Sequence, residues 1–392
     1  MMSILQLKSG RDRSVLNRHP WIFSGALKRK PDAKEGDIVE VRSTGGDVLG
    51  YGFYSDKSQI SCRMFDWNAQ PSDFESVDYW SDKVRRALWL RREMVIAADT
   101  DAYRLIHAEG DFMPGVIVDI YKDVAVAQLL IRAVEQRKDL IIEALRRNGY
   151  SKIYAKTKAS SRNIEAVEME AGWLTGDDGR SRLIREHGLM FEVDFVNGQK
   201  TGFFLDQRES RWLVRQMAKD KKVLNAFSYT GGFSVYAIAG QASEVHSLDI
   251  SADAVEMARK NVELNFPGAN HKGIARDCFE YLKDMPDQYY DLIILDPPAF
   301  AKNAKAIENA SRGYKQINLR AFNKIKPGGI LFTFSCSQNI DSELFRKIVF
   351  SAAADSGRKA RIIYQTRQPA DHPVNIYHPE GEYLKGLVLW VE

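Results

Sequence analysis

Residues 222–234 read Lys222-Val-Leu-Asn-Ala-Phe-Ser-Tyr-Thr-Gly-Gly-Phe-Ser, an apolar run followed by a glycine turn and an apparent helix start. Glycines at such a turn let the backbone approach a ligand at the helix N-terminus. The spacing differs from the Gly-x-Gly-x-x-Gly fingerprint of dinucleotide-binding proteins. Because glycines between a strand and a helix are often merely structural, a ligand-binding role for this turn needs support from the neighbouring strands.

Those neighbouring strands form a regular alternation with helical patterns. Strand-like runs recur in the following ranges: 222–227, 244–249, 271–276, 290–295 and 329–335. Strands separated by helices form right-handed crossovers and a mostly parallel sheet that is covered on both faces. Residues 361–364 and 384–391 would supply the remaining strands. The sequence therefore predicts an α/β, Rossmann-like domain over residues 186–392.

In such a sheet, ligands bind outside the carboxyl ends of the strands. The first strand ends in the turn that holds Phe227, Tyr229 and Gly231. Asp249 ends the second strand, where a carboxylate can accept hydrogen bonds from both ribose hydroxyls. Asp277 and Cys278 end the third strand, where they suit an adenine amine and an adenine ring. Either aspartate would also suit a helix cap, but three strand ends in this order favour a nucleoside pocket.

The fourth and fifth strands end in groups that suit catalysis. Asp296-Pro-Pro-Ala-Phe predicts a rigid extended loop, and the fifth strand ends in Ser335-Cys-Ser. Neighbouring strands lie roughly 5 Å apart, so Asp296 and Cys336 should emerge side by side. A buried, inert cysteine is the alternative, but this position favours a nucleophile.

A thiolate and a carboxylate suit methylation of cytosine at carbon 5. Addition of Cys336 at carbon 6 would make carbon 5 nucleophilic, and Asp296 could stabilise the charge near N3. A base must then remove the carbon-5 proton, and the sequence leaves four candidates open: Asp296, His378, Glu380 and Glu382. Phe300 or Tyr314 could stack on a flipped-out base, although either would also serve as a core residue.

Two smaller domains precede the Rossmann-like one. Short alternating strands within residues 36–66 predict a small β-barrel in a domain at 1–75, and an amphipathic stretch at 79–98 leads into a small α/β domain at 76–185. A hairpin formed by 189–195 and 197–204 should open the last domain. Residues 1–34 carry a local basic excess that suits RNA phosphates or, equally, a solvated face. The residues we assign to RNA binding are Arg11, Arg13, Arg18 and Lys28.

Composition excludes several classes of protein. The three cysteines lack disulfide or zinc-ligand spacing, so we expect free thiols and no metal. No apolar run approaches the roughly 20 residues of a membrane span, and the first residues lack a signal-peptide core, so we expect a cytoplasmic protein. A net charge of +4 permits a nucleic-acid partner without requiring one. The sequence fixes no oligomeric state and is compatible with a homodimer.

The motifs together resemble the bacterial 23S ribosomal RNA large-subunit methyltransferase I family over essentially the whole chain. They are Asn197-Gly-Gln-Lys-Thr-Gly-Phe-Phe-Leu-Asp-Gln-Arg, Phe227-Ser-Tyr-Thr-Gly-Gly-Phe-Ser, Asp296-Pro-Pro-Ala-Phe and Ser335-Cys-Ser; Gly10-Arg-Asp-Arg and His19-Pro-Trp-Ile-Phe-Ser-Gly resemble its PUA domain. The resemblance implies S-adenosyl-L-methionine as methyl donor, 5-methylcytidine in 23S rRNA as product and Cys336 as nucleophile. We add the following residues of the first motif to the expected cofactor site: Gln199, Thr201, Phe204 and Asp206.

Two other functions remain open from the sequence. One is a guanine or exocyclic-amine RNA methyltransferase, for which an Asp-Pro-Pro loop suffices and Cys336 is unnecessary. Amine methyltransferases typically place an aromatic residue directly after the two prolines, whereas Ala299 intervenes here. The other is an RNA-binding assembly protein with a catalytically idle Rossmann-like domain.

The chain departs from the wider RNA cytosine-5 enzymes at one position. Those enzymes often carry a second cysteine after the proline of the fourth-strand motif, and Pro297-Pro298 has none. The base that removes the carbon-5 proton therefore stays unassigned.

Overall fold

The computed structural model describes every residue except 1, 69, 158–164, 166, 177–178 and 302. The chain forms two compact units. The first unit comprises Met1–Ile184, Val193–Phe203 and Ala370–Gly381, and the second comprises Arg185–Glu192, Phe204–Pro369 and Glu382–Glu392. The division into three domains at 1–75, 76–185 and 186–392 stays a prediction. No helix in the described ranges is long and apolar enough to cross a membrane.

The first unit begins with the small barrel that the alternating strands predict. Its five-stranded sheet has the order β1-β3-β4-β5-β2. The strands are β1 (Ser3–Gln6), β2 (Trp21–Phe23), β3 (Ile38–Arg42), β4 (Val48–Tyr54) and β5 (Ile60–Asp66), with the short helix α1 (Arg13–Leu16) between β1 and β2. Leu5, Ile22 and Val39 point into its core.

The middle part of the first unit is a second five-stranded sheet, in the order β10-β9-β8-β7-β6. Its strands are β6 (Ala102–His107), β7 (Val116–Tyr121), β8 (Val124–Leu129), β9 (Lys152–Ala155) and β10 (Gly172–Thr175); its helices are α2 (Val77–Met94), α3 (Arg132–Gln136) and α4 (Lys138–Arg147). Ser76 caps α2 by accepting a hydrogen bond from the amide of Tyr79. Trp80 of α2 shares one hydrophobic cluster with Phe53 of the barrel, so the two parts pack together.

A hairpin stands where the chain passes between the units, but its strands differ from the prediction. β12 (Leu189–Asp194) pairs with β11 (Ser181–Glu186), and not with residues 197–204. His187 and Gly188 both have positive φ angles, 50° and 75°, which is the geometry of a two-residue hairpin turn. Residues 197–204 form turns, so the predicted second strand is wrong.

The second unit holds the predicted Rossmann-like sheet, with seven strands in the order β15-β14-β13-β16-β17-β19-β18. The strands are β13 (Lys222–Ala226), β14 (Glu244–Asp249), β15 (His271–Ala275), β16 (Leu292–Leu295), β17 (Gly329–Ser335), β18 (Ala360–Thr366) and β19 (Lys385–Val391). All pairs among β13 to β17 are parallel, and β19 is antiparallel to both neighbours. The strand predictions for this sheet are confirmed within one or two residues.

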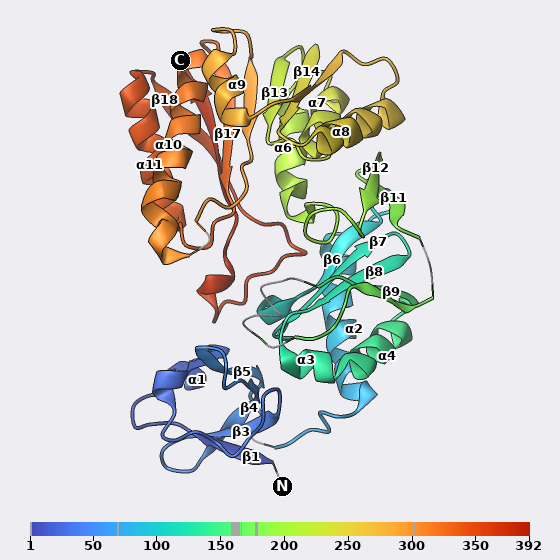
Figure 1. Ribbon diagram of the computed structural model, residues 1–392, viewed down its shortest axis with the longest axis vertical. Helices are drawn as coiled ribbons and strands as arrows, with labels where there is room; N and C mark the ends of the chain where they lie inside the picture. The colour runs from blue at the N-terminus through green and yellow to red at the C-terminus, as the bar shows by residue number, and fades with distance from the viewer. Residues whose placement is uncertain (1, 69, 158–164, 166, 177–178, 302) are drawn as a thin grey trace. The chain divides into compact units, whose positions relative to one another are not determined.

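Helices cover both faces of this sheet (Figure 1). They are α6 (Arg208–Met217), α7 (Gly232–Ala239), α8 (Ala252–Asn265), α9 (Cys278–Asp284), α10 (Ile307–Lys324) and α11 (Ser342–Ser356). Alternate residues of β13 point to opposite faces: Val223 packs with Val214 of α6, whereas Leu224 packs in the cluster that holds Ile317 of α10. This arrangement brings the carboxyl ends of β13 to β17 to one edge.

Candidate active site

The glycine turn after β13 has the tight backbone that a ligand-contacting loop needs. Phe227, Tyr229 and Gly231 have φ angles of 61°, 44° and 79°, so the chain folds back sharply before α7 begins. A Cβ atom at Gly231 would lie 2.7 Å from the Cβ of Ala258, so only glycine fits there. Two buried polar atoms at this turn, Asn225 Oδ1 and Ser228 Oγ, have no hydrogen-bond partner within the described part of the chain. Such atoms fit a polar ligand held at the turn.

Asp249 joins the ends of β13 and β14. Its Oδ2 accepts a hydrogen bond of 2.9 Å from the amide of Tyr229, and its Oδ1 accepts one of 3.0 Å from the amide of Ser251. Ser251, rather than Asp249, caps α8 with its side chain. The half-buried Asp249 carboxylate therefore fixes the glycine turn, and a carboxylate has acceptor sites left for a ligand.

At the end of β15, Asp277 has the helix-capping role that the sequence offered as an alternative to ligand binding. Asp277 is exposed and caps α9, accepting a hydrogen bond of 3.0 Å from the amide of Glu280. Cys278 is buried beneath it, 3.9 Å from the carbonyl oxygen of Leu248, and burial raises the pKa of its thiol to about 12. Cys278 is thus an inert apolar group. Contact of either residue with a cofactor stays a prediction.

The structure brings Asp296 and Cys336 to neighbouring strand ends. β16 pairs in parallel with β17, with Leu295 opposite Thr333. The sulfur of Cys336 lies 3.9 Å from the carbonyl oxygen of Pro297, and the residue is half-buried between the buried Ser335 and Ser337. The Asp296 carboxylate accepts a hydrogen bond of 2.9 Å from Gln207 Nε2, at the start of α6.

A buried ion cluster fixes that end of α6. Glu186 is fully buried and accepts hydrogen bonds from Arg208 Nε at 3.1 Å and from Arg211 Nε at 2.8 Å. The Tyr236 hydroxyl donates to the same carboxylate at 3.0 Å. The cluster therefore positions α6 and, through Gln207, the Asp296 carboxylate.

Tyr314 and Phe300 pack behind the Cys336 loop. Tyr314 is fully buried, and its hydroxyl lies 3.0 Å from Ser337 Oγ, so it acts as a core residue that supports the loop. Phe300 is only half-buried, with its ring centroid 4.6 Å from that of Tyr314. Of the two, Phe300 keeps an exposed part that a base could contact.

Lys385 is a site residue that the sequence interpretation missed. It begins β19, opposite Ser335 of β17. Its ammonium group donates hydrogen bonds to the carbonyl oxygens of Ser337 at 2.7 Å and of Tyr383 at 2.8 Å. Burial lowers its pKa to about 8, against the opposing influence of Cys336, Glu382 and Asp341. The available signal was a lone lysine at the head of an apolar strand, a position where an unpaired charge is costly.

The four residues expected from the first motif divide between the units. Phe204 and Asp206 lie in the second unit: the Phe204 ring packs edge-on against Tyr229 at 5.2 Å, and Asp206 accepts a hydrogen bond of 2.8 Å from the Tyr383 hydroxyl. Gln199 and Thr201 lie in the first unit. The buried Thr201 hydroxyl donates to Asp119 at 2.5 Å, while Gln199 is exposed.

The candidate bases divide in the same way. Asp296 and Glu382 belong to the unit that holds Cys336. His378 and Glu380 belong to the first unit, beside His19. The structure therefore groups two of the four candidates with the thiol.

The four basic residues assigned to RNA binding all lie on the barrel and are exposed: Arg11, Arg13, Arg18 and Lys28. None of them pairs with a carboxylate among the residues that the structure describes. Phe23, on the same barrel, is 48% exposed. Exposed cations and an exposed aromatic ring on the same barrel suit a nucleic-acid surface.

Comparisons with known proteins agree with this architecture. A family model of S-adenosylmethionine-dependent methyltransferases matches residues 103–369, and a model of PUA-like domains matches residues 5–67. The ribosomal RNA large subunit methyltransferase I of Enterobacter sp. (strain 638) is 41% identical over 390 residues, which covers 98% of each chain. That of Aeromonas salmonicida is 39% identical over 395 residues, which covers 99% of each chain.

A solved structure shares the fold over its full length. A putative SAM-dependent methyltransferase from Streptococcus mutans aligns over 100% of both chains with a TM-score of 0.85 and 24% identity. A putative methyltransferase complexed with SAH aligns equally fully, with a TM-score of 0.86. The PUA-like barrel and the Rossmann-like sheet are thereby confirmed. With its glycine turn, strand-end carboxylates and full-length relatives, this chain is an S-adenosylmethionine-dependent methyltransferase and belongs to the ribosomal RNA large subunit methyltransferase I family.

Proposed function

We propose that this protein methylates carbon 5 of a cytosine in 23S ribosomal RNA, with Cys336 as a covalent nucleophile. The observation that carries the proposal is the position of Cys336. This half-buried residue has its sulfur 3.9 Å from the carbonyl oxygen of Pro297, which belongs to the loop that begins with Asp296. The curated relatives, which are named as ribosomal RNA large subunit methyltransferases, support ribosomal RNA as the substrate and, with it, a cytoplasmic location.

The chemistry uses both side chains in turn. The Cys336 thiolate adds to carbon 6 of cytosine, and the electron pair of the ring double bond makes carbon 5 nucleophilic. S-adenosyl-L-methionine, when bound, supplies the electrophilic methyl group. Asp296, as the protonated carboxyl group, donates a hydrogen bond to the N3 side of the ring, where negative charge develops. Removal of the carbon-5 proton then restores the double bond and releases the thiolate. Asp296 and Glu382 are the candidates for that step in the unit that holds Cys336.

The cofactor would lie along the carboxyl ends of β13 to β16. We assign to it the turn residues Phe227, Tyr229 and Gly231, followed at the next strand ends by Asp249, Asp277, Cys278 and Asp296. Phe204 and Asp206 border this edge within the second unit. Contact of Gln199 and Thr201 with the cofactor stays a prediction from the first motif. Asn225 Oδ1 and Ser228 Oγ, which lack a hydrogen-bond partner among the described residues, support this placement.

Lys385 acts as a positioning residue in this proposal. Its ammonium group holds the Ser337 carbonyl and so fixes the loop that carries Cys336. A buried positive charge in this place also favours the thiolate over the thiol. The two effects together present a reactive sulfur beside the Asp296 loop.

A trapping experiment tests the covalent mechanism. RNA in which 5-fluorocytidine replaces cytidine cannot lose a proton from carbon 5, so the adduct should persist as a protein–RNA complex on a denaturing gel. Wild-type protein should form the complex only with S-adenosyl-L-methionine present, and Cys336→Ser should form none. Full transfer of methyl groups by Cys336→Ala, with a methylated guanine or amine as product, would instead establish the rival methyltransferase. Absence of any S-adenosyl-L-methionine affinity would establish a catalytically idle RNA binder.

A further inference from the structure

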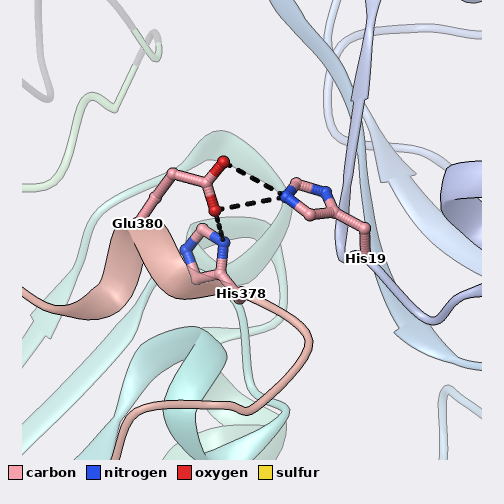
Figure 2. Close-up of side chains that lie close together, drawn as sticks. All are labelled: His19, His378 and Glu380. Carbon is pink, nitrogen blue, oxygen red and sulfur yellow. Dashed lines mark hydrogen bonds and ion pairs between the residues drawn. The ribbon is translucent and has the colours of Figure 1, made fainter.

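Three metal-ligating side chains converge in the first unit, outside the proposed active site. Figure 2 shows the Glu380 carboxylate between the imidazoles of His19 and His378. His19 Nε2 lies 3.2 Å from Glu380 Oε2, and His378 Nδ1 lies 3.0 Å from the same oxygen. One donor atom of each residue lies within 4.8 Å of the donor atoms of the other two. His19 and Glu380 are 361 positions apart in sequence, so tertiary structure alone assembles the group.

These spacings match those of ligands on one transition-metal ion. Two atoms bound to a tetrahedral zinc at about 2.0–2.1 Å are separated by about 3.3 Å. The two measured separations, 3.2 and 3.0 Å, are close to that value. Two imidazoles with one carboxylate form a donor set that prefers zinc or a similar transition ion over Mg²⁺ or Ca²⁺, which favour oxygen ligands.

The surroundings fix the orientation of both histidines. His19 Nδ1 accepts a hydrogen bond of 3.1 Å from the amide of Trp21 and lies 3.2 Å from its carbonyl oxygen, which leaves Nε2 facing the group. The His378 ring is 3% exposed and packs against the Trp21 ring at 4.4 Å. Glu109 in turn holds the Trp21 indole through a hydrogen bond of 2.9 Å.

The segment that carries His378 and Glu380 is also docked by other contacts. Asp371 accepts a hydrogen bond of 3.0 Å from the amide of Arg104, and its carbonyl accepts one of 2.9 Å from Arg91. Asn375 donates to the carbonyl oxygen of Glu109 at 3.2 Å. The ligands are therefore held in place before an ion arrives, which lowers the entropic cost of binding.

We propose that His19, His378 and Glu380 form a binding site for Zn²⁺ or a similar divalent transition ion, which links residues 370–381 to the barrel. Three protein ligands leave a fourth coordination position for water. The inference stands apart from the proposed cytosine chemistry, because none of the three residues lies in the unit that holds Cys336. It also replaces the expectation from the sequence that the chain binds no metal.

Metal titration of the full-length protein tests the site. Protein stripped with a chelator should bind one equivalent of Zn²⁺ by calorimetry, and should not bind Mg²⁺ at the same concentration. His19→Asn and Glu380→Gln should each weaken zinc binding at least about tenfold. His271→Asn is the matched control, since this histidine lies in the second unit, and should keep the wild-type affinity.

A stability measurement separates lost ligands from lost folding. Zinc should raise the melting temperature of the wild type and of His271→Asn, since an ion that binds only the folded state stabilises it. The two ligand variants should melt as stripped wild type does and show a much smaller rise. Zinc affinity unchanged in both ligand variants, or no stoichiometric zinc binding by a folded wild-type protein, would overturn the proposal.

Discussion

The ammonium group of Lys385 donates a hydrogen bond of 2.7 Å to the carbonyl oxygen of Ser337, the residue that follows Cys336. The contact crosses the antiparallel pair of β17 and β19, in which Ser335 stands opposite Lys385. A buried cation is thereby fixed next to the one cysteine that is not fully buried. The reactivity of the Cys336 thiol should therefore depend on Lys385, and this dependence can be measured.

Lys385→Met should make Cys336 less reactive toward iodoacetamide at neutral pH. Without the cation, less of the thiol is ionised, so the plot of alkylation rate against pH should shift to higher pH by about one unit. In the wild type, the gain in Cys336 reactivity should fade as pH rises through about 8, where Lys385 itself loses its proton. Peptide mass spectrometry assigns the alkylated site. Lys347→Met, an exposed lysine on α11, is the control; equal profiles for the two variants would refute the role of Lys385.

Asp249→Ala should weaken cofactor binding far more than RNA binding. The change removes the acceptor of two backbone hydrogen bonds, from Tyr229 and Ser251, and the proposed ribose contact. Loss of one charge-assisted hydrogen bond of about 1.5–3 kcal/mol corresponds to roughly 10- to 150-fold in affinity. Calorimetry with S-adenosylhomocysteine measures it. Asp253→Ala, in the first turn of α8, should bind like the wild type, and an equal loss there would point to general damage.

Charge reversal on the barrel should weaken RNA binding and reduce its salt dependence. Arg11→Glu and Arg13→Glu remove exposed cations, and each lost phosphate contact should lower the slope of log affinity against log salt by about 1. Fluorescence anisotropy at several salt concentrations gives the slope. Arg259→Glu, on α8 of the second unit, should leave it unchanged. Reduced cofactor affinity in the barrel variants would contradict this division of roles.

Glu186→Gln should destabilise the fold strongly. Two buried guanidinium groups, of Arg208 and Arg211, would lose their shared countercharge, and breaking a buried ion pair typically costs about 3–5 kcal/mol. Urea unfolding measures the loss of free energy. Glu209→Gln removes an exposed carboxylate next to Arg208 and should cost less than about 0.5 kcal/mol. Similar values for the two variants would show that the cluster contributes little.

The strand ends could be predicted from the sequence because the residue composition changes locally at each of them. Apolar runs stop at Gly231, Asp249 and Asp296, and parallel strands must bring such ends to one edge. The contact of Lys385 with Ser337 and the group of His19 with Glu380 could not be predicted, because the partners lie far apart in sequence. The hairpin prediction failed for a local reason: residues 197–204 look like a strand, but Gly202 takes a φ of 130° within a turn, and β11 supplies the pairing instead.

The position of β19 governs when this sheet can be completed. β19 (Lys385–Val391) follows the other six strands in sequence, yet it lies between β17 and β18 and pairs with both. Before β19 has been made, the facing edges of those two strands lack this neighbour. Exposed strand edges recruit other chains. A chain truncated before residue 385 should consequently hold an open sheet and aggregate.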